Sequence, residues 1–244
     1  MKHPGALPGE GISDLRALLY EINVEVSGET LEKLASHLRA VVAANDQVRL
    51  TAITDLAEGL RLHIVDSLTI LPEVQTTCGL CVDLGSGAGF PGIPLSLATG
   101  RRFLLLESVR KKAEFLLRMA SMLGIAGQVE VAALRAEELA LSRPGEFAAV
   151  TARAVSELPA LVELAAPLLS EGGVLISMKG VPSPLEIERG DQAAALVGMR
   201  RSSFRELELP GKREKRSIVV YEKGVKTLRD LPRRPGRAQK KPLA

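Results

Sequence analysis

Residues 81–95 read CVDLGSGAGFPGIPL, and the types and spacing of these residues could bind a nucleotide. Four glycines fall within eight positions, directly after a short apolar run that is typical of a buried strand. Glycine-rich turns between a strand and a helix let backbone N–H groups approach a phosphate or a sugar closely. The chemistry of the chain is therefore expected at this turn, and the first question is which nucleotide it holds.

Gly87, Gly89 and Gly92 satisfy the dinucleotide pattern G-x-G-x-x-G, but their context argues against a dinucleotide. The dinucleotide fingerprint begins directly after its strand, whereas here Asp83 would turn a carboxylate toward a pyrophosphate. Pro91 also suits the first turn of a helix better than a tight phosphate turn. An NAD-binding oxidoreductase is therefore the weaker interpretation.

Two carboxylates favour S-adenosylmethionine as the ligand. Asp83 stands two positions before the first glycine, where it fits a ligand with a cationic head, and S-adenosylmethionine carries an ammonium and a sulfonium group. Glu107 closes the next apolar run, FLLLE, at the distance where an acidic side chain would hold ribose hydroxyls. With Gly85 and Gly87 in the turn between them, these carboxylates predict a cofactor for methyl transfer.

Alternating strands and helices must position these groups. Short apolar runs without polar alternation indicate parallel strands that are covered on both faces; they span 80–84, 103–107, 128–133, 147–152 and 173–179. Two further runs, 200–209 and 214–223, have no convincing helix between them and read as an antiparallel hairpin. The predicted fold class is α/β, a Rossmann-like and mostly parallel seven-stranded sheet with an antiparallel C-terminal hairpin.

Helical periodicity runs through residues 12–70 ahead of the sheet, with Ser27 and Asp55 among the candidate N-caps and Pro72 as the stop. The expected organisation has three parts: a helical region at 1–75, a methyltransferase domain at 76–224, and a basic, disordered tail at 225–244.

Positive charge is concentrated in that tail. Residues 224–244 hold seven Lys or Arg against one Asp, although the whole chain carries only +3. With few large apolar residues, the tail is not expected to bury enough surface to order itself. The tail is either a solvated end of the chain or an arm that binds polyanions such as RNA, and its composition is compatible with both hypotheses.

Composition sets aside several other classes of protein. Cys78 and Cys81 form a C-x-x-C pair, but a zinc site needs two further ligands and all three histidines precede the pair, so no metal is expected. No apolar run approaches the roughly 20 residues of a membrane span. No signal peptide is visible either, and a cytoplasmic protein is expected.

The glycine turn belongs to a longer motif that resembles one family. VDLGSGAGFPGIPLSLA is similar to the cofactor loop of the ribosomal RNA small subunit methyltransferase G family, also called the glucose-inhibited division protein B family. The likeness continues through HIVDSL (63–68), LLESVRKKAEFL (105–116), RAEEL (135–139), TARAVSEL (151–158), SMKG (177–180) and KREKRSIVVYEK (212–223). The resemblance implies a class I methyltransferase sheet behind a helical N-terminal part, and methylation of N7 of one guanine in 16S ribosomal RNA.

The resemblance also implies site residues. The cofactor contacts of the family fall on Gly85, Phe90, Glu107, Ala136, Glu137 and Arg153. Arg153 and Lys179, both at strand ends, are the candidate catalytic residues, facing RNA phosphate or the guanine edge. With a ribosomal substrate, the candidate RNA-binding residues are Lys111, Lys112, Lys179, Arg213, Arg216, Arg233 and Arg234.

The absence of the motifs of two other classes of methyltransferase is consistent with methylation at guanine N7. Guanine N7 has an unprotonated lone pair, so its attack on a sulfonium methyl needs alignment and no base. Methylation of an exocyclic amine would predict Asn/Asp-Pro-Pro-aromatic after the fourth strand, where TARAV stands, and methylation of pyrimidine C5 would need a later cysteine. His63 is therefore expected to have a structural role, linked to Asp66 or Ser67 on its own helix.

Two departures from the family pattern are visible: Arg49 stands where the family has Asn, and the tail from Val225 is not a shared feature. The expected partner is 16S ribosomal RNA or the small ribosomal subunit, bound by a monomer without membrane contact. A methyltransferase of another RNA, a protein or a small molecule remains the alternative, and a binding module without catalysis is a third.

Overall fold

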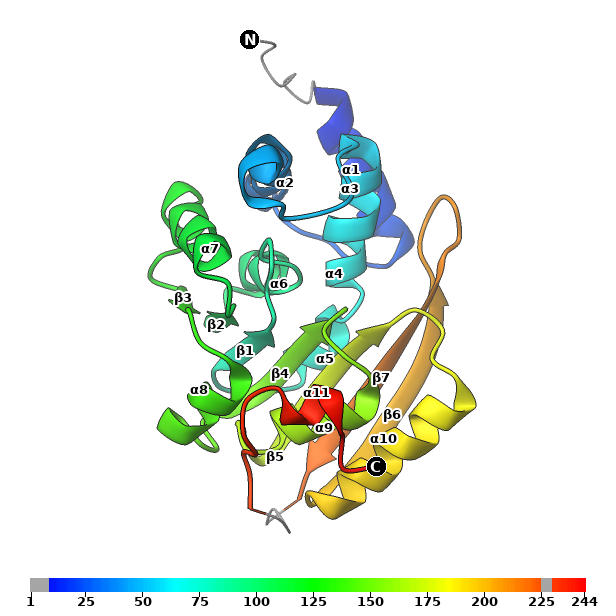
Figure 1. Ribbon diagram of the computed structural model, residues 1–244. Helices are drawn as coiled ribbons and strands as arrows, with labels where there is room; N and C mark the ends of the chain where they lie inside the picture. Colours follow the sequence, from blue (N-terminus) through cyan, green and yellow to red (C-terminus); the bar gives the residue numbers. More distant parts are fainter. Residues whose placement is uncertain (1–8, 225–229) are drawn as a thin grey trace.

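A computed structural model describes residues 9–224 and 230–244, and a seven-stranded sheet lies at its centre (Figure 1). The strand order is β3-β2-β1-β4-β5-β7-β6. The strands are β1 Cys81–Leu84, β2 Phe103–Leu106, β3 Val129–Ala132, β4 Phe147–Arg153, β5 Leu169–Lys179, β6 Met199–Glu208 and β7 Lys215–Lys223. The first five run parallel, and β7 pairs antiparallel with both β5 and β6. The predicted fold class, with its C-terminal hairpin, is confirmed.

Helices cover both faces of the sheet. One face carries α8 (Ala136–Ser142), α9 (Leu158–Ala165), α10 (Pro184–Leu196) and α11 (Arg237–Lys240), and Figure 1 shows α9 to α11 in front of the strands. The other face packs on α6 (Gly92–Thr99) and α7 (Arg110–Met122). Successive strand residues point to opposite faces, so Phe103 and Leu105 enter one core while Leu104 and Leu106 enter the other.

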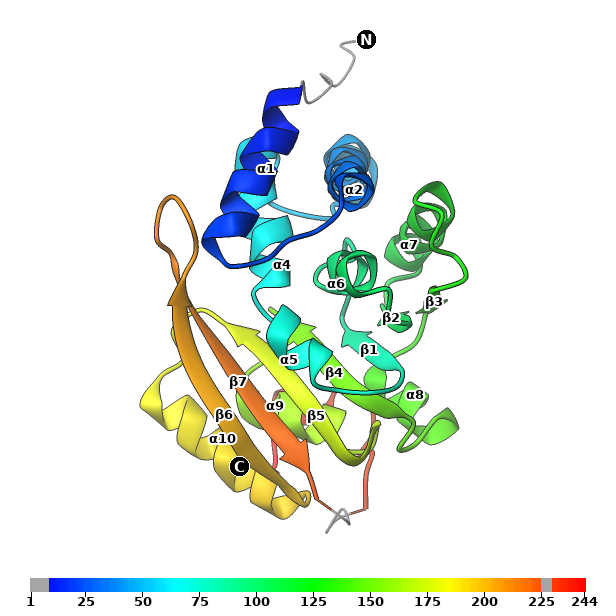
Figure 2. The same ribbon diagram turned by 180° about the vertical axis from the view of Figure 1, so that it is seen from behind.

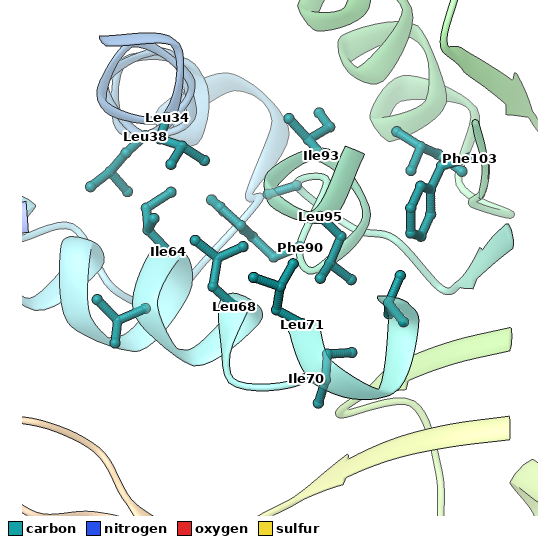
Figure 3. Close-up of a cluster of buried hydrophobic side chains, with 14 of the residues drawn as sticks. Leu34, Leu38, Ile64, Leu68, Ile70, Leu71, Phe90, Ile93, Leu95 and Phe103 are labelled. Atoms are coloured by element: carbon teal, nitrogen blue, oxygen red, sulfur yellow. The ribbon is translucent and has the colours of Figure 1, made fainter. Parts of the chain in front are cut away.

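The N-terminal region is helical, as predicted. Its elements are α1 (Gly9–Glu21), α2 (Gly28–Val48), α3 (Leu56–Gly59), the π-helical turn η1 (Leu60–Val65), α4 (Asp66–Leu68) and α5 (Leu71–Gln75). Of these, α2, α4 and α5 lie beside α6, and α5 lies against the sheet when the molecule is seen from behind (Figure 2). Leu38, Ile64 and Leu68 meet Phe90 and Ile93 in one buried cluster (Figure 3). The N-terminal helices therefore share a core with the sheet and help to build its ligand crevice.

The helix starts follow the predicted caps, but the predicted stop is wrong. Ser27 Oγ accepts from the Thr30 N–H at 3.1 Å, and Asp55 Oδ1 accepts from the Glu58 N–H at 2.8 Å. Pro72 lies in the first turn of α5 and does not end the preceding helix. A proline is tolerated there because the first N–H groups of a helix have no intrahelical partner.

Arg49 ends α2 in the left-handed region, at φ 50°. Asparagine is favoured in that conformation, so the Asn of the family pattern suits the position better than Arg does. The Asn45 side chain secures the following turn, because its Oδ1 accepts from the N–H groups of Leu50 and Thr51 at 2.8 Å each. This turn places the Thr51 hydroxyl beside His63, which belongs to the site described below.

The expected disorder of the tail does not hold for residues 230–244; residues 225–229 lie outside the described part. Ala238 in α11 is 2% exposed and packs in the same core as α9, with Leu231 and Leu243 beside it. Arg233 forms a bidentate ion pair with the buried carboxylate of Glu163 in α9. The few apolar residues of the tail find a partner surface on the sheet domain, which composition alone does not reveal.

Candidate active site

The turn from β1 to α6 needs glycine at two positions for steric reasons. Gly85 has φ 73°, and a Cβ on it would lie 2.9 Å from a methyl carbon of Val155, the second residue after β4. A Cβ on Gly92 would lie 2.8 Å from Asp83 Oδ2 and 2.4 Å from Leu105. The turn therefore packs closely against both the end of β4 and the first strand, as a loop that cradles a ligand must.

Asp83 holds this turn from inside the protein. Its side chain is fully buried, Oδ2 accepts from the Gly92 N–H at 3.1 Å, and Oδ1 accepts from the Thr151 hydroxyl at 3.0 Å. Burial raises the pKa of Asp83 to about 6, opposed by these hydrogen bonds. The predicted direct contact between Asp83 and a cationic ligand is not what the structure shows, because protein donors enclose the carboxylate. Asp83 shapes the loop instead.

Glu107 lies directly after β2, where the sequence placed it, and faces the same turn. Its Oε2 accepts from the Gly87 N–H at 3.0 Å and its Oε1 from the Val109 N–H at 2.7 Å. The carboxylate is 6% exposed and both neighbours of Glu107, Leu106 and Ser108, line a cavity. A carboxylate held by two main-chain donors at a strand end is oriented to accept from a ligand hydroxyl.

We call this space the β2 cavity. Its walls are mostly apolar, and it is lined by Leu84, Gly85, Leu106, Ser108, Leu134, Arg135, Ala136, Glu137, Val155, Leu164 and Gln239. Three of the predicted cofactor residues, Gly85, Ala136 and Glu137, are among them. Gln239 was not predicted, because it comes from α11 in the tail.

A second space, the β4 cavity, opens at the ends of β4 and β5 and has a volume of about 390 Å³. It is lined by Ile53, Leu62, His63, Asp66, Arg153, Ala154, Met178, Lys179, Gly180 and Arg216. This size falls in the range of small-molecule sites. Ala154 lines the β4 cavity and the next residue, Val155, lines the β2 cavity, so the two spaces lie on either side of the end of β4.

Charged groups in the β4 cavity are paired around one carboxylate. Asp66 Oδ2 accepts from Arg153 Nη1 at 3.2 Å, and Asp66 Oδ1 accepts from Arg216 Nε at 3.0 Å. Arg153 also donates to the Leu62 carbonyl at 3.0 Å. Lys179 lines the same cavity but lies 2.7 Å from Glu186, so its charge is already paired. Arg153 and Lys179 line the cavity at the strand ends where the sequence analysis expected them, and Arg216 and Asp66 join them there without having been predicted to do so.

A stack of three rings supports the wall of the β4 cavity. The Phe90 ring lies 4.5 Å from the His37 ring and 4.7 Å from the His63 ring, between centroids, and it is 5% exposed. His63 Nε2 lies 2.8 Å from the Thr51 hydroxyl, and the predicted link to Ser67 is present through the main chain, since the Ser67 hydroxyl donates to the His63 carbonyl. Phe90 lines neither cavity, and its contact with the cofactor stays a prediction. Its ring joins the N-terminal helices to the cofactor loop.

Both stacked histidines are neutral. Burial lowers the pKa of His37 to about 4, and burial together with the nearby charge of Arg153 lowers the pKa of His63 to about 4. A neutral ring adds no charge to the cation-rich wall beside it.

The remaining basic candidates are dispersed. Lys111 and Lys112 lie in the first turn of α7, and Arg213 is exposed in the loop between β6 and β7. Arg234 is exposed, whereas its neighbour Arg233 is committed to Glu163. Arg233 is therefore an anchor of the tail, and its predicted contact with RNA would require this ion pair to break.

Metal and membrane sites are not found in the described residues. Within 9–224 and 230–244 no group of His, Cys, Asp and Glu could hold a metal ion, and Cys78 and Cys81 are both free thiols. No helix in the same residues is long and apolar enough to cross a bilayer.

Solved structures show the fold of this chain in other proteins. A geranyl diphosphate methyltransferase in complex with GPP and sinefungin is 16% identical with a TM-score of 0.55, covering 86% of this chain and 98% of that one. The [4+2]-cyclase SpnF is 13% identical with the same TM-score, covering 83% and 98%. Because a cyclase shares this fold, the fold alone does not identify the reaction.

Sequence relatives are more specific. The ribosomal RNA small subunit methyltransferase G of Carboxydothermus hydrogenoformans is 36% identical over 94% of this chain and 98% of the relative. That of Deinococcus radiodurans is 36% identical over 98% of this chain and 96% of the relative. The second alignment extends into the tail, so at least this relative has a matching segment there. A family model described as rRNA small subunit methyltransferase G also matches residues 30–219. This chain belongs to the rRNA small subunit methyltransferase G family.

Proposed function

We propose that this protein transfers the methyl group of S-adenosylmethionine to N7 of a guanine in 16S ribosomal RNA. One observation carries the proposal: a cation-rich cavity opens at the end of β4, directly across that strand end from a cavity suited to the cofactor. The methyl group would pass from one to the other beside Arg153 and Ala154.

The β2 cavity has a volume of about 90 Å³ and offers part of the surface that would hold the adenosine end of the cofactor. Glu107 offers a fixed carboxylate for ribose hydroxyls, and the apolar side chains of Leu106, Leu134 and Val155 offer surfaces for a flat base. The lack of a side chain at Gly85 leaves the turn open to the ligand. S-adenosylmethionine supplies a methyl group that its sulfonium activates, so the protein need not activate it further.

In the β4 cavity the protein would orient the guanine and balance charge. N7 is unprotonated at neutral pH, so no side chain is required to remove a proton. Asp66 fixes the guanidinium groups of Arg153 and Arg216, which are suited to donate to guanine O6 or to a flanking phosphate. Catalysis would then rest on alignment and on a fixed electrostatic environment.

Exposed cations would bind the RNA around the target base. Lys111 and Lys112 lie close in sequence to Ser108 at the rim of the β2 cavity, and Arg213 lies three residues before Arg216 of the β4 cavity. At 3% aromatic residues the chain has few stacking platforms, so phosphate contacts and RNA shape would dominate recognition. We place the activity in the cytoplasm, where ribosomes assemble, and expect a monomer.

The decisive test is methylation in vitro. Labelled S-adenosylmethionine is incubated with the protein and either deproteinised 16S ribosomal RNA or small ribosomal subunits, and the nucleosides are then separated. We expect labelled 7-methylguanosine at a single site. Label in another nucleoside, in protein or in a small molecule would support the alternative methyltransferase, and no 7-methylguanosine with either substrate would contradict the proposal.

A further inference from the structure

The C-terminal segment 230–244, which we call the arm, crosses α9 and reaches the β2 cavity. Its two ends are fixed: Arg233 pairs with Glu163, whose side chain is 3% exposed, and Arg189 Nη2 donates to the Ala244 carbonyl at 2.8 Å. Between them, Ala238 packs into the core. The arm is thus held on the sheet domain by an ion pair, a hydrogen bond and apolar contact.

The arm touches the cofactor region at two points. The Gly236 N–H donates to Glu137 Oε1 at 2.7 Å, and Glu137 is a buried residue of the β2 cavity. Gln239 contributes part of the cavity wall itself. Gln239 is exposed, and its carboxamide has no hydrogen-bond partner among the described residues, so a ligand can reach both its donor and its acceptor.

We propose that the arm completes the cofactor site and that Gln239 positions the adenine base by hydrogen bonds to its polar edge. The proposal rests on the proposed function, in which the β2 cavity takes adenosine. The methyl group must reach the β4 cavity, so the adenosine end points the other way, past Glu107 toward Ala136 and Gln239. Adenine presents an amino donor beside a ring-nitrogen acceptor, and a carboxamide complements both.

Coupling between the arm and the cofactor follows by linkage. If the docked arm contributes a contact to the cofactor, the cofactor must favour the docked arm by the same factor. The exposed cations of the arm, such as Arg234 and Lys240, are then ordered together with the cofactor although they line neither cavity. A role in RNA binding alone would not produce this coupling.

The first test is calorimetric binding of S-adenosylhomocysteine to the full chain. Gln239→Ala should weaken binding about 3- to 10-fold, the value of one or two hydrogen bonds, whereas Lys240→Ala, the exposed neighbour, should change it less than about twofold. An analogue with hydrogen in place of the adenine 6-amino group should lose affinity for the wild type and lose less for Gln239→Ala. Equal binding by the two variants, or equal discrimination against the analogue, would overturn the proposal.

The second test addresses docking of the arm. Arg233→Ala combined with Glu163→Gln removes the ion pair without leaving a buried charge, and should weaken cofactor binding as Gln239→Ala does. Arg234→Ala is the matched control and should leave it unchanged. In the wild type, saturating S-adenosylhomocysteine should slow tryptic cleavage within the arm. An arm cleaved at the same rate with and without ligand would contradict the coupling.

Failure of this proposal can be told from failure of the proposed function. Normal formation of 7-methylguanosine with equal cofactor affinity in Gln239→Ala and Lys240→Ala would remove the arm from the site and leave the function intact. Normal cofactor binding with the predicted difference between these variants, but no methylated guanine, would remove the RNA substrate and keep the arm. A wild type that does not bind the cofactor would overturn both.

Discussion

The β2 and β4 cavities lie on either side of one strand end, yet they hold their carboxylates in different ways. At the β2 cavity, main-chain N–H groups fix Glu137, which lines it, and Glu107, whose neighbours Leu106 and Ser108 line it. In the β4 cavity, the side chains of Arg153 and Arg216 fix Asp66. A main-chain donor cannot move without its loop, whereas a guanidinium can exchange a carboxylate for a phosphate or a base edge.

This difference matches the two ligands. The cofactor is the same molecule in every cycle, and a rigid set of acceptors suits it. An RNA substrate arrives with a polyanionic backbone and must be fitted around its target base, so cations that can change partners are useful there. The comparison predicts that substitutions in the β4 cavity impair methyl transfer and those in the β2 cavity impair cofactor affinity.

The largest effect is expected from Asp66→Ala. Without the carboxylate, Arg153 and Arg216 lose their common partner and their orientation, so methyl transfer to RNA should fall about 10²-fold. Cofactor affinity should change less than about threefold, because no main-chain donor of the β2 cavity is touched. Initial rates with 16S ribosomal RNA and calorimetric cofactor binding separate the two.

A matched control is Glu73→Ala. Glu73 pairs with Arg205 at 2.6 Å and is partly buried, but it lines neither cavity. Its removal should cost stability while the rate of methyl transfer stays within a few fold of the wild type. If Asp66→Ala lowered cofactor affinity as strongly as it lowered the rate, the separation of the two cavities would be wrong.

Glu107→Ala should have the next largest effect, and on the opposite property. It removes a carboxylate that accepts from two N–H groups and is aimed at the ribose, so cofactor affinity should fall about 10- to 100-fold. RNA binding should be unchanged in a filter or mobility assay. Glu114→Ala, on the exposed side of α7, serves as the control. Normal cofactor affinity in Glu107→Ala would exclude its ribose role.

The sequence predicted part of the β2 cavity because the ligand crevice lies along the carboxyl ends of parallel strands. Gly85, Glu107 and Ala136 each follow a strand that its apolar run identifies, and the strand order then brings them together. Much of the β4 cavity wall comes from N-terminal helices, whose placement on the sheet depends on long-range packing. His63 and Asp66 were recognised as part of a motif, but their partners were not predictable from local spacing.

Two other predictions, for Asp83 and for the tail, differ from the structure for the same physical reason. A strand-end carboxylate such as Asp83 can face a ligand or the interior, and only the packing of Gly92 and Thr151 around it decides which. The arm looked unable to order itself because its own apolar content is low, but Glu163 and the surface of α9 supply what it lacks. Local composition does not report a partner surface that lies far away in the sequence.

The buried ionisable groups of the two sites affect the pH dependence of stability in opposite ways. Asp83 supports the cofactor loop, and the two histidines support the wall of the β4 cavity. The raised pKa of Asp83, about 6, means that its stabilising contribution is present at low pH and is lost as pH rises through 6. The lowered pKa values of His37 and His63, about 4, mean that their contribution is lost as pH falls below 6.5 toward 4. The two effects oppose each other in the same range.

Asp83→Asn should therefore reveal the contribution of the two histidines to the pH dependence of the free energy of unfolding. Between pH 4.5 and 6 the free energy of unfolding of the variant should rise more steeply with pH than that of the wild type, by about 1.5 kcal/mol over the interval. Urea unfolding at several pH values measures the slope. A variant whose pH dependence is parallel to that of the wild type would show that Asp83 has an ordinary pKa in the folded protein.

The smallest effect is expected from the two lysines in the first turn of α7, the exposed Lys111 and the half-buried Lys112, which line neither cavity. Replacing both Lys111 and Lys112 by Ala should weaken RNA binding only a few fold at physiological salt, and should reduce the slope of log affinity against log salt by about 1 to 2. Arg200→Ala with Arg201→Ala removes the same charge, but these arginines are already paired with Glu222 and Asp191 on the hairpin. That control should change the slope less. If both double variants changed it equally, net charge alone would account for RNA binding, and the first turn of α7 would have no special part in it.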